Sequence, residues 1–143
     1  LQHSVAAQTK NVPDKGTEVS AYKAAFDLLK AGRYQQAVDA FTGFMESYPD
    51  GVYADNSQYW LGEANYVIRN FDAAQTEFNK VIENFPKSPK AADALLKIGY
   101  IHYERGDWKN ARETLEKVRR DHPRASAAGL ADKRLERMER EGR

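Results

Sequence analysis

The chain has 143 residues, enough for one domain, of which 41% are hydrophobic and 30% are charged. Its 22 basic and 21 acidic residues leave a formal net charge of +1, too balanced for a nucleic-acid binder that neutralises phosphates. The absence of cysteine excludes disulfides and thiol chemistry. No apolar run reaches the roughly 18 residues that would predict membrane insertion.

The first part of the chain has no regular pattern. Residues 1–17 show neither a helical nor a strand period, and Pro13 and Gly16 stand among polar residues, so we predict a disordered linker or tail. The chain starts without Met and without an apolar signal region, as expected of a processed chain or an excised domain. Apolar residues recur at helical spacing from residue 18 onward, which predicts one domain over residues 18–141.

A block of about 37 residues occurs three times, at about 18–49, 52–86 and 89–123. A period of this size predicts a stack of structural repeats, and such stacks are usually binding surfaces. Four columns of the sequence keep the 37-residue spacing: Pro49, Pro86 and Pro123; Tyr34, Phe71 and Trp108; Ala37, Ala74 and Ala111; Phe41, Phe78 and Leu115.

Each block predicts two helices, A and then B, with the B helix ending before its proline because the residue preceding Pro disfavours helical geometry. We expect Ala25, Gly62 and Gly99 on the A helices to let the two helices approach closely. The aromatic residues at 34, 71 and 108 are expected to fill the gap where the helices meet. A last helix over about 126–141 has few apolar residues and a charged face, which is typical of a cap that closes a repeat array.

The spacing of Leu61-Gly62, Ala74, Phe78 and Pro86 is similar to that of the tetratricopeptide family. The resemblance implies an all-α fold: a right-handed tetratricopeptide superhelix of three helix-turn-helix repeats plus a C-terminal capping helix. In that family the A helices line the concave face.

Four runs of residues, 59–63, 85–90, 93–99 and 130–135, resemble the C-terminal domain of the YbgF/CpoB family of periplasmic cell-division coordinators. The resemblance implies a non-catalytic adaptor that binds TolA and links outer-membrane constriction by the Tol-Pal system to peptidoglycan synthesis by a bifunctional penicillin-binding protein. Family members trimerise through an N-terminal coiled coil. This chain lacks a heptad segment, so we expect a homotrimer only for the full-length protein and a monomer for this domain.

The same resemblance places the partner-binding groove on the A helices. Aromatic rings with a polar tip suit peptide recognition because they bury a large area at a low cost in conformational entropy. Some of these rings are also candidates for simple packing between repeats, and we assign Trp60 to packing. The predicted groove residues are Tyr22, Phe26, Asn56, Tyr59, Glu63, Tyr66, Asp93, Lys97, Tyr100 and Tyr103.

No motif indicates catalysis, a cofactor or a metal. His3, His102 and His122 lack the spacing of metal ligands, and neither a phosphate-binding loop nor a nucleophile with an adjacent base is present. Only Lys97 fits the basic clamp by which many tetratricopeptide domains hold a chaperone tail. The basic residues near the C-terminus, including Arg134 and Arg137, are interleaved with acidic ones, which indicates a solvated face.

Two other functions remain open on this reading. One is a scaffold subunit of outer-membrane protein assembly, similar to the BamD lipoprotein, although that family has more repeats and a lipidated cysteine. The other is a purely structural oligomerisation module without a client.

Overall fold

The computed structural model describes residues 15–143, and this part of the chain contains helices joined by turns. The expected all-α fold is confirmed: three A–B pairs are followed by a final helix. The predicted tail lies outside the described residues up to residue 14, and residues 15–17 form the start of the first helix. The helices are α2 (Lys15–Lys30), α3 (Tyr34–Ser47), α4 (Ala54–Val67), α5 (Phe71–Asn84), α6 (Lys90–Glu104), α7 (Trp108–Asp121) and α8 (Ser126–Arg140).

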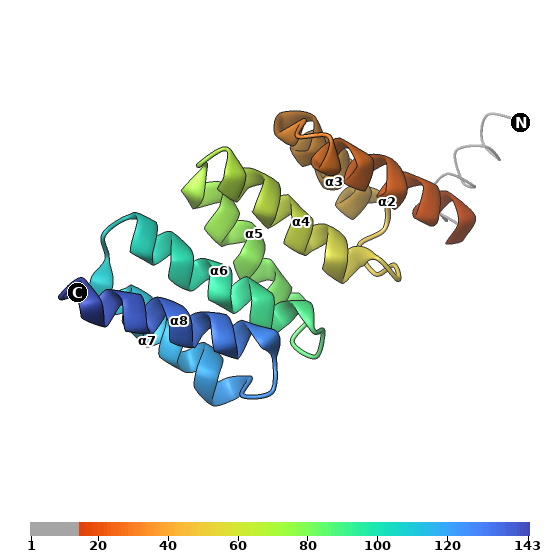
Figure 1. Cartoon of the computed structure of the whole chain (residues 1–143). Helices are drawn as coiled ribbons and strands as arrows, with labels where there is room; N and C mark the ends of the chain where they lie inside the picture. The colour runs from red at the N-terminus through yellow and green to blue at the C-terminus, as the bar shows by residue number, and fades with distance from the viewer. Residues whose placement is uncertain (1–14) are drawn as a thin grey trace, which may run out of the picture.

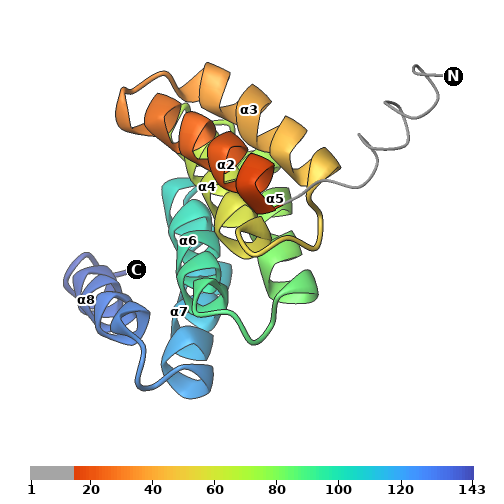
Figure 2. The same cartoon turned by 90° about the vertical axis from the view of Figure 1, so that its right-hand side faces the viewer.

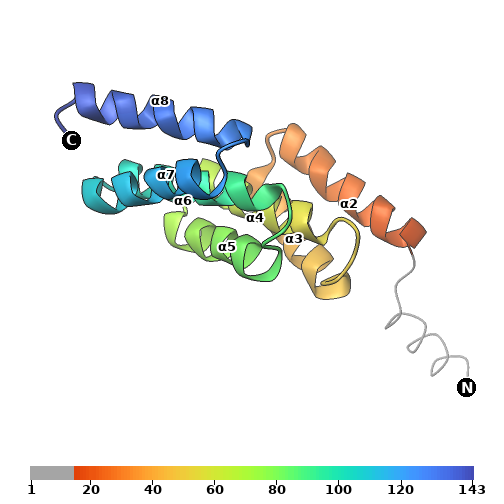
Figure 3. The ribbon, with the colours of Figure 1, turned by 90° about the horizontal axis from the view of Figure 1, so that it is seen from below.

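The helices form two layers. The A helices α2, α4 and α6 follow one another along the stack, with α2 and α8 at its opposite ends (Figure 1). Successive pairs are turned relative to one another, so that α2 and α3 run across the direction of α6 and α7 (Figure 2). Viewed from below, α8 and α2 lie on the side of the stack opposite α3 and α5 (Figure 3). One face of the molecule is therefore built by A helices and by α8.

The A and B helices end in a similar backbone geometry in each repeat, with glycine in two of the three A-to-B turns and a proline after every B helix. The A-to-B turn contains one residue in the left-handed region: Gly32 at φ 77°, Arg69 at φ 63° and Gly106 at φ 73°. The residue before each proline is the first one after its B helix, and all three of these residues have φ −133°. The boundaries thus follow from local chemistry, since only glycine adopts positive φ without a steric cost and a residue before proline avoids the helical region.

Helices A and B touch where the A helix has no side chain. A Cβ atom built on Gly62 would lie 2.6 Å from the Phe78 ring, and one on Gly99 would lie 2.8 Å from Leu115. The expected close approach at these two glycines is therefore confirmed. The core repeats with the sequence: fully buried residues at each level are Ala37, Ala74 and Ala111, Phe41, Phe78 and Leu115, and Val81 and Val118.

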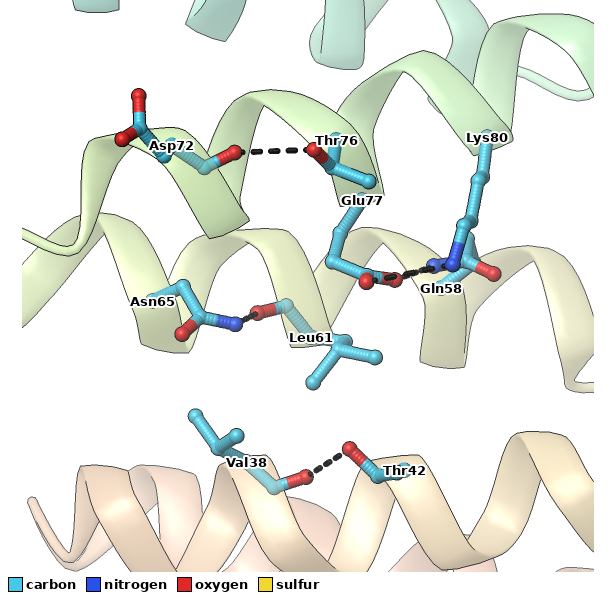
Figure 4. A network of polar contacts seen from close by, with 9 residues as sticks. All are labelled: Val38, Thr42, Gln58, Leu61, Asn65, Asp72, Thr76, Glu77 and Lys80. Atoms are coloured by element: carbon cyan, nitrogen blue, oxygen red, sulfur yellow. Dashed lines mark hydrogen bonds and ion pairs between the residues drawn. The ribbon is translucent and has the colours of Figure 1, made fainter.

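A few polar side chains of α4 are buried. Gln58 is only 4% exposed and its amide donates a hydrogen bond to Glu77, which also pairs with Lys80 (Figure 4). Asn65, equally buried, donates through Nδ2 to the carbonyl of Leu61 one turn earlier at 3.0 Å. These bonds satisfy groups that would otherwise be costly to bury.

Two loops between repeats are held by acidic side chains of the preceding A helix. The buried carboxylate of Glu18 accepts a hydrogen bond from the Tyr53 N–H at 2.8 Å. One repeat later, Asp55 accepts from the hydroxyl of Ser88 at 2.6 Å. In the third repeat the corresponding residue is Ala92, which belongs to an apolar cluster instead. The hydrogen bond from a loop to a carboxylate thus occurs in the first two repeats, and apolar packing replaces it next to α8.

Helix α8 corresponds to the A helix of an unfinished fourth repeat. Its buried residues Ala131 and Met138 lie 37 residues after the buried Ala94 and Ile101 of α6. The position of Gly62 and Gly99, however, is occupied by the exposed Glu136. A carboxylate at the site of closest helix approach disfavours docking of a B helix against this side of α8.

Two glycines of the first repeat provide a test of the backbone argument. We expect Gly43→Ala, in the exposed middle of α3 with open space around its Cα, to stabilise the domain by about 0.5–1 kcal/mol. Gly32→Ala has equally open surroundings but a positive φ, and should destabilise by about 1 kcal/mol. Urea unfolding of both variants measures the difference. Equal effects would show that the turn imposes no conformational requirement.

The second stability prediction concerns Ala74, which is fully buried on α5. Ala74→Leu should overpack the contact and destabilise the domain by about 1–3 kcal/mol. Thermal unfolding followed by circular dichroism checks this value, with Ala73→Leu as a matched control because Ala73 is only partly buried. An unchanged melting temperature for Ala74→Leu would contradict the assignment of this column to the core.

Candidate functional site

The candidate site is the surface formed by the sides of α2, α4 and α6 that carry the ten predicted groove residues, here called the A-helix face. One contact recurs along it at the 37-residue spacing. The side chain at 60, 97 or 134 reaches back to the preceding A helix and touches the residue at 26, 63 or 100, respectively. The recurrence places these side chains on one continuous face.

Between α2 and α4 the contact is aromatic. The rings of Phe26 and Trp60 lie 5.4 Å apart, and the Trp60 indole N–H donates a hydrogen bond to the Tyr22 hydroxyl at 3.1 Å. Tyr22 stacks on Tyr53 at 4.6 Å and on Phe26 at 5.9 Å. Burial raises the pKa of Tyr22, because its effect outweighs that of the hydrogen bonds from Trp60 and Asn56, which lower the pKa. This end of the face is a half-buried aromatic cluster.

Between α4 and α6 the contact is an ion pair. Lys97 Nζ lies 2.9 Å from Glu63 Oε1, and the two side chains are only 18% and 22% exposed. The same ammonium lies 4.8 Å from the centre of the Tyr66 ring and 5.9 Å from that of Tyr100. Glu63 and Lys97, both predicted groove residues, thus neutralise each other beside the aromatic rings.

Between α6 and α8 the contact is a cation on aromatic rings. The Arg134 guanidinium lies 4.1 Å from the Tyr100 ring centre and 4.7 Å from that of Tyr103. The Tyr103 hydroxyl also bonds to Glu141, and this bond raises the pKa of Tyr103 more than any other cause. Helix α8 therefore lies against Tyr100 and Tyr103, leaving less of both rings accessible than an uncovered A helix would.

The remaining predicted residues differ in their exposure. Tyr59 is 7% exposed and packs in the core against Phe78, so a ligand has little of this ring to touch. Burial also raises the pKa of Tyr59 far above its usual value. Asp93 is half-buried, and desolvation raises the pKa of its carboxyl despite the opposing effect of Lys90 and Lys97.

Sequence reasoning missed three contributors to this face. Trp60, which we assigned to packing between repeats, does bridge α2 and α4 but remains partly exposed. Lys90 lies 4.7 Å above the Trp60 ring, and Arg134 covers Tyr100 instead of pointing only into solvent. The 37-residue spacing contained the signal for Arg134, because one repeat added to Lys97 leads to it.

The described residues contain no helix with the length and apolarity needed to cross a membrane. In the same part of the chain, no group of three or more potential metal-ligating side chains lies close enough together to hold an ion.

The paired helices, the 37-residue period and the A-helix face define a tetratricopeptide-repeat protein. Comparison with known families agrees, because residues 93–125 match the tetratricopeptide repeat. Residues 14–96, more than half of the chain, match the family YfiO, described as an outer membrane lipoprotein, and the chain belongs to this family.

Curated relatives confirm the resemblance inferred from the sequence. The chain is similar to the cell division coordinator CpoB of Pseudomonas putida, with 48% identity over 52 residues, and to that of Escherichia coli, with 40% identity over 52 residues. Each match covers 36% of this chain but only 19% and 20%, respectively, of the relatives. The matched part is therefore about a fifth of those longer proteins.

Solved structures confirm the fold. The first tetratricopeptide domain of Spaghetti (RPAP3), bound to an HSP90 peptide, has a TM-score of 0.71 at 18% identity, covering 89% of this chain and 94% of the other. PcrH in complex with the chaperone binding region of PopB also has a TM-score of 0.71, at 16% identity, covering 85% of this chain and 96% of the other. At these identities the likeness concerns the architecture alone.

The ion pair between α4 and α6 generates a prediction. Lys97→Met should leave the Glu63 carboxylate desolvated among aromatic rings and destabilise the domain by about 1–3 kcal/mol, less than for a fully buried pair. Adding Glu63→Gln should restore most of the loss. Chemical denaturation of both single variants and the double variant measures the coupling. Strictly additive losses would contradict the claim that the two charges depend on each other.

Proposed function

We propose that this domain is a non-catalytic periplasmic adaptor whose A-helix face binds a segment of TolA. Through this contact it coordinates constriction of the outer membrane by the Tol-Pal system with peptidoglycan synthesis by a bifunctional penicillin-binding protein during cell division. The observation that carries the proposal is the similarity to two proteins named cell division coordinator, at 48% and 40% identity over 52 residues.

The surface chemistry of the A-helix face supports binding rather than catalysis. Its partly exposed rings, Phe26, Trp60 and Tyr66, offer large apolar contacts with little conformational entropy to lose. The rings are held by neighbours: Tyr66 by Phe71 at 5.6 Å and by the Lys97 ammonium. A surface that is already ordered loses less conformational entropy on binding.

Within the predicted groove, the accessible anchors are those that neither the core nor α8 covers. We propose Phe26 and Tyr66 as the aromatic contacts and Asn56 and Asp93 as polar contacts near them. Glu63 and Lys97 support the rings from below through their ion pair. Tyr59 contributes by holding Trp60, whose ring lies 5.0 Å away.

Tyr66 provides the test of this function. Tyr66→Ala removes one aromatic anchor and should weaken binding of a periplasmic TolA fragment by about 30-fold, equivalent to about 2 kcal/mol. Isothermal titration of the folded variant measures the change, and circular dichroism checks that the helices remain.

The control is Tyr48→Ala, at the end of α3 in the other helix layer, where the ring packs only against Phe44 among the described aromatic residues. This variant should bind the TolA fragment as the unmodified domain does. If both variants lose binding equally, or if neither does, the partner docks elsewhere, on the B helices or on α8.

A second candidate function is favoured by the matched family itself, which is described as an outer membrane lipoprotein. In that case the domain is a scaffold of outer-membrane protein assembly, and the A-helix face holds another subunit. Photo-crosslinking from position 66 in cells separates the two, because the first function predicts adducts with TolA and the second predicts adducts with an outer-membrane assembly subunit.

A further inference from the structure

Charge is unevenly distributed along the stack. Residues 105–143 contain twelve basic and eight acidic residues, whereas residues 15–104 contain nine basic and twelve acidic residues. The end of the domain formed by α7 and α8 is therefore positive although the chain as a whole is nearly neutral. Long-range fields of this kind steer a charged partner toward one end of a binding surface.

Helix α8 concentrates this charge on the A-helix face. One repeat of 37 residues added to Lys97, Tyr100 and Tyr103 leads to Arg134, Arg137 and Arg140. The same step from Asp93 leads to Leu130, which is 45% exposed. The α8 part of the face is thus a stripe of three arginines next to an exposed leucine.

Most of these cations lack a carboxylate partner. Among the described residues, only Arg137 of the three arginines forms an ion pair, with Glu141 at 3.3 Å, and its side chain remains 52% exposed. Arg134 lies on Tyr100 and Tyr103, and Arg140 is exposed on the last turn of α8. In contrast, the cations at the other end of the face, Lys23 and Lys30, share Asp27.

We propose that α8 is part of the binding surface and binds acidic side chains of the partner. The bound segment is amphipathic: its apolar residues lie on Leu130 and on the rings of the A-helix face, and its carboxylates lie on Arg134, Arg137 and Arg140. Guanidinium groups suit this role because they bind carboxylates with two hydrogen bonds and are easily desolvated. The inference rests on the proposed function and specifies the chemistry of its partner.

The geometry of α8 explains why one segment contacts both regions. Arg134 already touches the rings of α6, so the arginine stripe and the aromatic rings are continuous rather than separate patches. The rings at the other end also carry cations, because Lys30 lies over Phe26 and Lys90 lies over Trp60. Lysine contacts a carboxylate as a point charge, whereas the arginines of α8 bind it with two hydrogen bonds, so the acidic side chains of the segment favour the α8 end.

The test uses two labelled peptides of about 15 residues, roughly 22 Å long when helical. Both have leucine at the same helical positions, and the polar positions are glutamate in one and lysine in the other. We expect the glutamate peptide to bind the domain at least about tenfold more tightly in fluorescence anisotropy, with a preference that weakens as salt is added.

The decisive variant is Arg137→Gln with Arg140→Gln, which leaves the Arg134 contact intact and should abolish the preference for the acidic peptide. The matched control, Lys109→Gln with Lys117→Gln on α7, removes the same charge from exposed positions and should keep the preference. Equal binding of both peptides, no binding of either, or equal losses in both double variants would each overturn the proposal.

Two further measurements separate this inference from its alternatives. The domain should not bind anionic vesicles of phosphatidylglycerol and phosphatidylcholine. If it does bind them, and the Arg137→Gln and Arg140→Gln variant does not, the arginine stripe contacts a lipid surface instead. Titration of the TolA fragment is independent of the peptides. If TolA binds but the peptides are not distinguished, the function stands and the role of α8 fails. If the acidic peptide is preferred but TolA does not bind, the role of α8 stands and the proposed function fails.

Discussion

The close approach of helices A and B within each repeat is the contact on which the rest of the structure depends. At Gly62 and Gly99 the neighbouring side chains, Phe78 and Leu115, occupy the space that a Cβ atom would need. Interdigitated atoms at the same position of the second and third repeats favour the same crossing geometry in both pairs. A similar geometry within the pairs favours an arrangement in which the A helices lie side by side.

The residue type at one position of the A-helix face varies between repeats, because this position does not form the main core. The same structural position is filled by Trp60 on Phe26, by Lys97 on Glu63 and by Arg134 on Tyr100. The B-helix columns, in contrast, keep small or apolar residues that are fully buried in every repeat. The B-helix columns are thus constrained by core packing, whereas one position of the A-helix face differs in chemistry from repeat to repeat.

Helix α8 contributes to both sides of the last repeat. Toward solvent, Glu136 stands at the position where Gly62 and Gly99 accept their B helices. Toward the A-helix face, Arg134 covers the Tyr100 ring and extends the charged part of the surface. The cap is therefore a component of the candidate site, and its removal would expose two tyrosines together with the apolar cluster formed by α6 and α7.

Local sequence features were sufficient to predict the helix pairs, their ends and the core columns. Prolines, the turn glycines at 32 and 106 and the 37-residue period act locally, through backbone sterics and side-chain spacing, so each can be recognised without knowledge of the neighbouring helix. Which groove residues are accessible was decided only by the tertiary structure. Tyr59 is buried, Glu63 is paired with Lys97, and Arg134 lies on Tyr100 because successive A helices lie within side-chain reach of one another. That distance is set by how whole repeats stack, and no pattern within one helix specifies it.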